Sequence, residues 1–215
     1  MSDEKYIATE EEFDTAFSGQ PSPMIILKNH IYFYANIDEV IAKTLISALH
    51  EVAMEIINVS FDHNVPIVPI ELHINSCGGE VSSAIGIVKT IEDIQNGTIH
   101  KIGDIPIKVP VNTHIEGECD SAASLIACVG NHRTISKHSL SLIHDVRIIG
   151  GISGINKSED IATQAVNIEM FKQIFYDIYL KHSKLTYKKL EEISGNERYS
   201  TPEELLKYGL VDEIV

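Results

Sequence analysis

Residues 115–130 read I-E-G-E-C-D-S-A-A-S-L-I-A-C-V-G, and this stretch decides how the rest of the chain is interpreted. A largely apolar run at 107–111 leads into it, and a helical pattern of small residues leaves from Ser121. A serine at a strand-to-helix junction has its hydroxyl near unpaired N–H groups, at the positive end of the helix dipole. That environment stabilises a nucleophile and the oxyanion that it creates. Ser121 is therefore a candidate nucleophile, and the alternative is the common role of serine as a helix N-cap.

Composition and charge restrict the class of protein. The chain has 215 residues, 44% hydrophobic and 22% charged, which is enough for one domain with a sizeable core. A formal net charge of −14 argues against nucleic-acid binding, because nothing would offset the repulsion from phosphate. No apolar run has the length of a membrane span, and the N-terminus lacks the pattern of a signal peptide. We therefore expect a cytoplasmic protein that contacts neither membrane nor nucleic acid.

The three cysteines, Cys77, Cys119 and Cys128, include no C-x-x-C pair, and an odd number does not suit a disulfide framework. No H-E-x-x-H motif occurs either, so no metal site is expected. Cys119 and Cys128 are interpreted as packing residues.

The order of the expected elements indicates an α/β fold. Residues 1–22 are polar and acidic and predict a flexible arm, followed by a single domain at 23–215. A nearly continuous apolar strand at 66–74, typical of a strand buried on both faces, leads into two glycines and a helical stripe, the rhythm of a βαβ unit. Further strands are expected at 24–27, 31–34, 109–115, 133–135, 140–143 and 210–215. Helices are expected at 121–129, 159–182 and 187–193, and two more are expected to begin at Asp38 and at Thr201. A hairpin or loop is expected at 96–110 and a turn at 194–198.

Serine hydrolysis needs a nucleophile, a base, a group that orients the base, and donors for the oxyanion. His144 ends an apolar strand and is the candidate base, although a histidine there is often only structural. Glu197 and Asp145 are the candidate orienting carboxylates. The pair Gly78–Gly79 lets the backbone approach a substrate closely, or it forms a tight turn without such a role.

Four ordered segments resemble one known family. I-N-S-C-G-G-E-V (74–81) resembles the I-N-S-P-G-G motif of the proteolytic subunit of Clp protease, ClpP. G-E-C-D-S-A-A-S (117–124) resembles its nucleophile segment, G-x-x-x-S-M-G-A. S-L-I-H-D-V (141–146) resembles its histidine strand, M-I-H-Q-P, which is also followed by two glycines. E-R-Y-S-T-P-E-E-L-L-K-Y-G-L-V-D-E-I (197–214) resembles its C-terminal signature, D-R-F…A-x-E-Y-G-L-V-D.

The resemblance implies a fold and a set of site residues. The fold would be a crotonase/ClpP-like spiral ββα core with a protruding handle helix, in a handle segment at about 147–182. Carried over by position, Ser121 is the nucleophile, His144 the base and Glu197 the orienting carboxylate. The oxyanion N–H groups would come from Gly79 and Ala122, and the glycines that line the substrate site would be Gly78, Gly150 and Gly151.

The resemblance also implies partners. Copies of the chain would form a homo-oligomer of stacked rings, fed by a separate AAA+ unfoldase of the Clp type. ATP would be used only by that unfoldase, so this chain would need no cofactor. The substrates would be peptides or unfolded proteins.

Departures from the family pattern concern the site itself. Glu197 replaces the usual aspartate, and Cys77 replaces a proline. Asp120 places a carboxylate directly before the nucleophile, where it would repel an acyl oxyanion. The stretch 96–110 is longer than the usual link and predicts a hairpin near the mouth of the site.

The leading interpretation is a ring-forming serine endopeptidase, of which a processing enzyme for phage capsid proteins would be a variant. The alternative is a catalytically weak or inactive structural subunit of a Clp-type ring, because Glu197 and Asp120 weaken the triad. A crotonase-type acyl-CoA enzyme would share the core, but Ser121 with His144 is not what that chemistry needs.

Overall fold

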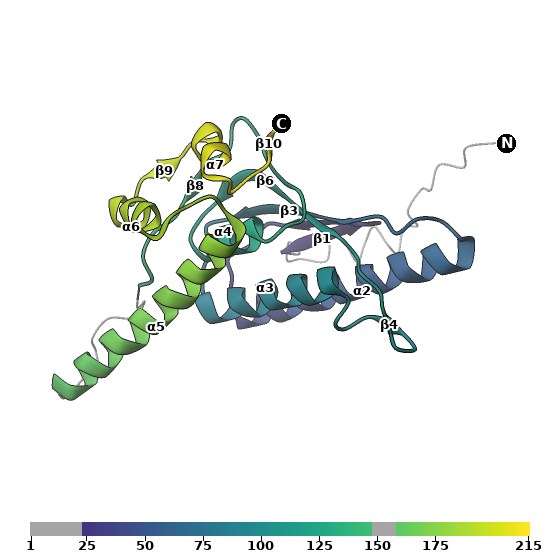
Figure 1. The fold of residues 1–215 in the computed structure, drawn as a ribbon, viewed down its shortest axis with the longest axis horizontal. Helices are drawn as coiled ribbons and strands as arrows, with labels where there is room; N and C mark the ends of the chain where they lie inside the picture. Colours follow the sequence, from purple (N-terminus) through teal and green to yellow (C-terminus); the bar gives the residue numbers. More distant parts are fainter. Residues whose placement is uncertain (1–22, 148–157) are drawn as a thin grey trace.

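The computed structural model describes residues 23–147 and 158–215 (Figure 1). The predicted arm at 1–22 and the two substrate-site glycines, Gly150 and Gly151, lie outside the described residues.

A six-stranded sheet forms the centre of the molecule, in the order β1-β2-β3-β6-β7-β10. β1 and β2 are antiparallel, and every other neighbouring pair is parallel. The expected α/β fold is therefore confirmed. The strands are β1 (Met24–Leu27), β2 (His30–Phe33), β3 (Ile70–Ser76), β6 (Val111–Cys119), β7 (Arg133–Ile135) and β10 (Glu213–Ile214).

Three helices bury their apolar sides beneath this sheet: α2 (Glu39–His63), α3 (Val81–Asn96) and α4 (Ala122–Cys128). α2 and α3 run side by side along one face of the sheet (Figure 1). α2 starts where the sequence predicts, because the side chain of Asp38 accepts a hydrogen bond from the N–H of Ile41 at 2.8 Å. α4 is buried along its whole length, as its small apolar residues require.

The prediction that the apolar strand at 66–74 is buried on both faces is wrong. β3 starts at Ile70 and alternates, with Ile70, Leu72 and Ile74 fully buried and Glu71 and His73 half-buried on the opposite face. An alternating strand has one face toward the core and one toward solvent. The sheet therefore has an open polar face opposite α2 and α3.

The long helix α5 (Ser158–His182) leaves the body of the molecule and points away from it (Figure 1), which confirms the predicted handle helix. Its C-terminal half is anchored by Phe175, Tyr176 and Tyr179, which are buried. Farther out, Val166 and Met170 are exposed.

The C-terminal part contains α6 (Tyr187–Asn196), β9 (Tyr199–Ser200) and α7 (Pro202–Tyr208). α6 continues through the predicted turn at 194–198 as far as Asn196, because Ser194 packs inside rather than facing solvent. β9 pairs with β8 (Ser141–Leu142), the short strand that precedes His144.

Candidate active site

Ser121 joins β6 to α4 in a strained backbone conformation. Its φ of 52° and ψ of −125° are rare for a residue with a side chain, and such strain concentrates at functional sites. Its N–H donates to the carbonyl of Leu142 at 2.7 Å, which holds the turn in place. The hydroxyl makes no capping hydrogen bond with α4. The N-cap alternative is therefore not the role of this side chain, and within the described residues its oxygen makes no hydrogen bond.

Of the two adjacent glycines, Gly78 packs against this turn and Gly79 packs against Ile37. Gly78 has a φ of 92°, and a Cβ on it would lie 2.6 Å from the carbonyl oxygen of Asp120 and 2.8 Å from the Cβ of Ser121. Gly79 has a φ of 145°, and its Cβ would lie 2.1 Å from the carbonyl oxygen of Ile37. No other residue type fits either position without displacing the backbone.

The N–H groups expected to bind an oxyanion are present and unpaired. Within the described residues, neither the N–H of Gly79 nor that of Ala122 donates a hydrogen bond. The nitrogen of Ala122 lies 3.0 Å from the position of a Cβ on Gly78, so the glycine loop and the start of α4 are in direct contact. Two free N–H donors beside a free serine hydroxyl are the elements of an oxyanion hole.

His144 lies in the same pocket as Ser121, which has a volume of about 370 Å³ and is also lined by Cys77, Arg147 and Phe175. Its Nδ1 is 2.7 Å from the carbonyl oxygen of Asp145. A carbonyl only accepts, so Nδ1 carries the proton and Nε2 of the neutral ring has a free lone pair. This is the tautomer that a general base needs. No hydrogen bond joins the side chains of Ser121 and His144 in the described structure.

Within the described residues, no hydrogen bond or ion pair joins either candidate carboxylate to the imidazole of His144. Glu197 ends α6 and forms an ion pair with Arg147, whose hydrogen bond and charge lower the pKa of Glu197. Asp145 accepts hydrogen bonds from Tyr176 at 3.0 Å and Lys172 at 3.2 Å. Burial opposes the ionisation of Asp145, but its hydrogen bonds outweigh burial and lower its pKa.

Asp120 and Glu118 form a second pair of carboxyl groups near Ser121. The sequence patterns singled out Asp120 but not Glu118. Asp120 is 4% exposed, and its Oδ1 accepts from the N–H of Leu142 at 2.8 Å. Burial, together with a hydrogen bond to Glu118, raises the pKa of Asp120 to about 7. Glu118 also accepts from the hydroxyl of Tyr199 at 2.8 Å. The spacing of 118 and 120 on one strand was the available signal, because residues two apart share a face.

A family comparison now bears on this geometry. Residues 19–215, nearly the whole chain, match the model of the Clp protease family. The chain belongs to the Clp protease family. Membership indicates a ClpP-like peptidase, and the parallel-rich sheet agrees with the predicted ClpP-like fold. Members of this family typically form oligomers.

The pocket that contains Ser121 and His144 continues into an apolar groove that the sequence did not reveal. The groove has a volume of about 550 Å³ and lies beside Gly79, between Val81 of α3 and the α5 residues Ile168 and Phe171. Such a surface suits apolar side chains of a peptide.

Other buried groups near the nucleophile have packing roles, as the sequence predicted. Ser124 donates to the carbonyl of Ser121 at 2.6 Å and shares a short hydrogen bond with Tyr179. Cys119 and Cys128 are buried, and burial raises the pKa of Cys128 to about 12.

The longer link at 96–110 does contain the predicted hairpin, formed by β4 (Lys101–Ile102) and β5 (Ile105–Pro106). Its predicted place near the mouth of the site is wrong. The hairpin follows the C-terminus of α3, whereas the glycine loop precedes the N-terminus of that helix (Figure 1). A helix of 16 residues is about 24 Å long, so the helix separates the hairpin from the nucleophile.

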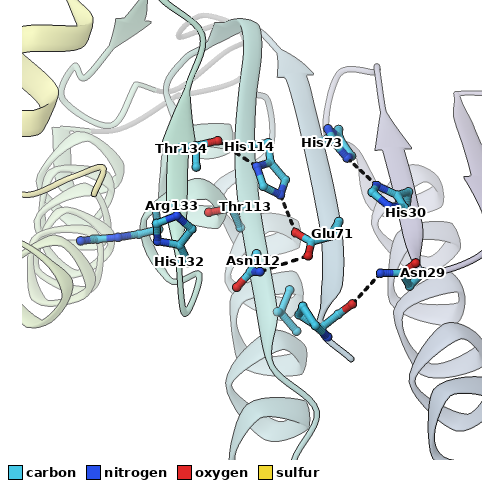
Figure 2. A network of polar contacts seen from close by, with 12 residues as sticks. Asn29, His30, Glu71, His73, Asn112, Thr113, His114, His132, Arg133 and Thr134 are labelled. Atoms are coloured by element: carbon cyan, nitrogen blue, oxygen red, sulfur yellow. Dashed lines mark hydrogen bonds and ion pairs between the residues drawn. The ribbon is translucent and has the colours of Figure 1, made fainter. Parts of the chain in front are cut away.

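The open face of the sheet carries a separate polar network (Figure 2). The rings of His73 and His114 stack with centroids 4.6 Å apart, and Nδ1 of His30 lies 3.0 Å from Nε2 of His73. Nε2 of His114 contacts Glu71 at 2.6 Å. In the described ranges, no group of three or more histidine, cysteine or acidic side chains is arranged to hold a metal ion, and no helix is long and apolar enough to cross a membrane.

Proposed function

We propose that this chain is a serine endopeptidase that hydrolyses peptides or unfolded proteins through an acyl-enzyme at Ser121. The single observation that carries the proposal is the free hydroxyl of Ser121, strained into position beside two unpaired N–H groups. Strain of this kind is retained where the surrounding structure is built to keep it.

The reaction follows from the groups around the hydroxyl. Ser121 Oγ attacks the peptide carbonyl while Nε2 of His144 takes its proton, and the N–H groups of Gly79 and Ala122 bind the oxyanion. His144 then gives that proton to the departing amine as the C–N bond breaks. A water molecule attacks the ester, His144 takes its proton, and Ser121 recovers the proton when the acid leaves.

Glu197 is proposed as the group that orients the protonated His144, in an arrangement where it exchanges Arg147 for the imidazole. After the hydrogen bond and charge of Arg147, the charge of a protonated His144 would also lower the pKa of Glu197, which supports this assignment. Gly78, Gly150 and Gly151 are proposed to line the bound peptide.

The working particle is proposed to be a homo-oligomer of stacked rings in the cytoplasm. No cofactor is proposed for this chain, and ATP would act only through a separate AAA+ unfoldase. The groove beside Gly79 would receive apolar side chains of the substrate.

A specific observation favours a second candidate, a structural ring subunit with little activity. Glu197 is paired with Arg147, and among the described residues the imidazole of His144 has only a backbone carbonyl as its hydrogen-bond partner. A subunit of this kind would need an active partner chain in a mixed ring.

The test is hydrolysis of fluorogenic peptides and of an unfolded protein by the full chain, with native mass recorded on the same sample. Ser121→Ala should abolish hydrolysis, while Ser47→Ala, at an exposed serine of α2, should not change it. A large particle with no hydrolysis above that of Ser121→Ala would reject the peptidase and support the structural subunit.

A further inference from the structure

The carboxylate of Asp145, the residue directly after the candidate base, is held by two side chains of the long helix α5. Its Oδ1 accepts from the hydroxyl of Tyr176 at 3.0 Å, and its Oδ2 accepts from the ammonium of Lys172 at 3.2 Å. Lys172 and Tyr176 are four residues apart on α5, so they lie on the same face of that helix. Each oxygen of the carboxylate therefore has its own donor.

The hydroxyl of Tyr176 is fixed in turn by α6. Tyr176 is fully buried, and its oxygen lies 2.6 Å from the hydroxyl oxygen of Ser194, which is also buried. A phenol has one proton and an ionised carboxylate only accepts, so Tyr176 donates to Asp145 and Ser194 donates to Tyr176. The ammonium of Lys172 also lies over the Tyr176 ring, 5.2 Å from its centre. Side chains of α5 and α6 together thus set the position of the Asp145 carboxylate.

The main chain around Asp145 has no strand pairing to hold it. The pairing of β8 with β9 ends at Leu142, and within the described residues no backbone–backbone hydrogen bond is formed by 144–147. A segment without such bonds opens more easily than a paired strand. The contacts of the Asp145 side chain with buried Tyr176 therefore attach the segment that carries the base.

The backbone of Asp145 determines the form of that base. Its carbonyl oxygen is 2.7 Å from Nδ1 of His144, so Nδ1 carries the proton and Nε2 can accept one. A displacement of this peptide unit would break the hydrogen bond and release the ring into its other tautomer, in which Nε2 carries the proton. The side chain of Asp145 thus anchors the peptide unit whose carbonyl orients the imidazole.

We propose that the three side chains that hold Asp145 are positioning residues, which act through Asp145 to keep His144 in the orientation and tautomer of a general base. The inference rests on the proposed function, in which His144 takes the proton of Ser121. The anchored carbonyl orients the neutral ring before the reaction, whereas Glu197 is proposed to act on the imidazolium that forms during it.

The first experiment measures kcat and KM of the full chain with a fluorogenic peptide. Tyr176→Phe keeps the ring and removes the hydroxyl, and it should lower kcat about tenfold with KM within about twofold of the native value, because the base is misplaced while the substrate still binds. Combined with Lys172→Met, it should lower kcat about 100-fold, the order that a misplacement of about 1 Å costs. Ser194→Ala should lower kcat by less than Tyr176→Phe does.

Two further variants keep this test specific. Lys172→Arg retains the charge toward Asp145 and should stay within about threefold of the native kcat. Lys181→Met is the matched control, because Lys181 lies about 13 Å along the same helix from Lys172 and pairs with Glu92. It should retain the native kcat. An equal fall of kcat in Lys181→Met, or a native kcat in the Lys172→Met/Tyr176→Phe double variant, would overturn the proposal.

A readout without activity separates this proposal from the proposed function. Nitrogen-15 NMR of the histidine-labelled chain at about pH 8, where histidine rings are largely neutral, reports which ring nitrogen carries the proton. The signals of His144 are those lost in His144→Gln. We expect the native ring to be protonated on Nδ1, and we expect the double variant to show both tautomers.

The two readouts give distinct outcomes. If the tautomer changes in the double variant but the native chain hydrolyses no peptide, the anchoring of His144 stands and the peptidase is rejected. If the native chain hydrolyses peptides and the double variant keeps the Nδ1 tautomer, the anchoring is refuted and the peptidase stands.

Discussion

At the scale of single residues, the site depends on backbone positions that only glycine can occupy. Gly79 leaves no space for a Cβ against Ile37, it lines the pocket of Ser121, and its N–H donates no hydrogen bond within the described residues. The strained turn at Ser121 packs against Gly78 of the same loop. Catalytic geometry at this scale is a consequence of close backbone packing.

Gly79→Ala should therefore damage both function and stability. We expect fluorophosphonate labelling to fall more than about 100-fold, the order lost with an oxyanion donor. The free energy of unfolding should fall by roughly 2–4 kcal/mol, because the new methyl group forces the loop away from Ile37. Gly195→Ala is the matched control, since Gly195 lies in α6 with open space around it and should gain stability by up to about 1 kcal/mol. An unchanged labelling rate in Gly79→Ala would contradict the account.

The third member of the triad can be assigned by mutation. Glu197→Gln should lower kcat about tenfold or more, because an orienting carboxylate stabilises the imidazolium of His144. Arg147→Gln removes the competing partner of Glu197 and should leave kcat equal or higher. If Asp145→Asn lowers kcat and Glu197→Gln does not, Asp145 is the carboxylate that orients His144.

At the scale of elements, the pattern of the sequence predicted most helices and strands, including the Asp38 cap and the start of α7 at Thr201. Both begin with a side chain that accepts from the first turn, which is local chemistry that a sequence displays. The strand at 66–74 was misassigned because Glu71 and His73 interrupt an apolar run only twice. The position of the hairpin relative to Ser121 depends on the direction in which α3 runs. That direction cannot be predicted from a local sequence pattern.

The open face of the sheet should make the fold sensitive to acid. Burial, together with the neighbouring ring of His114, lowers the pKa of His73 despite its contact with Glu116. A histidine with a lowered pKa stabilises the fold above its unfolded value of about 6.5 and loses this contribution as the pH falls further. His73→Gln should therefore flatten the loss of unfolding free energy between pH 7.5 and pH 5, measured with urea. His138→Gln, at an exposed histidine, should behave like the native chain; an equal slope in His73→Gln would contradict the prediction.

At the scale of the whole molecule, α5 extends from the body built around the sheet, with the apolar side chains of Val166 and Met170 exposed. The meeting of Ser121 and His144 in one pocket was predictable because each lies in a motif with its own local sequence. The contacts of Glu197 with Arg147 and of Glu118 with Tyr199 were not, because each joins segments distant in the chain. The mode of assembly cannot be predicted from local sequence either, because it depends on surfaces contributed by several elements.

The exposed part of α5 should hold two rings together. Val166→Glu combined with Met170→Glu should halve the native mass without changing the circular dichroism spectrum, because buried like charges would face each other across the contact. Ile105→Glu, at the exposed tip of the hairpin, should leave the mass unchanged. If instead Ile105→Glu halves the native mass and the double variant in α5 leaves it unchanged, the interface lies at the hairpin and not on α5.

The measurement that tests the central claim most directly is the mass of the chain after reaction with a fluorophosphonate, followed by peptide mapping. The account predicts one adduct per chain, on Ser121, and none in Ser121→Ala. An intact, assembled protein that forms no adduct, or that carries it on another residue, would contradict the assignment of Ser121 as the nucleophile.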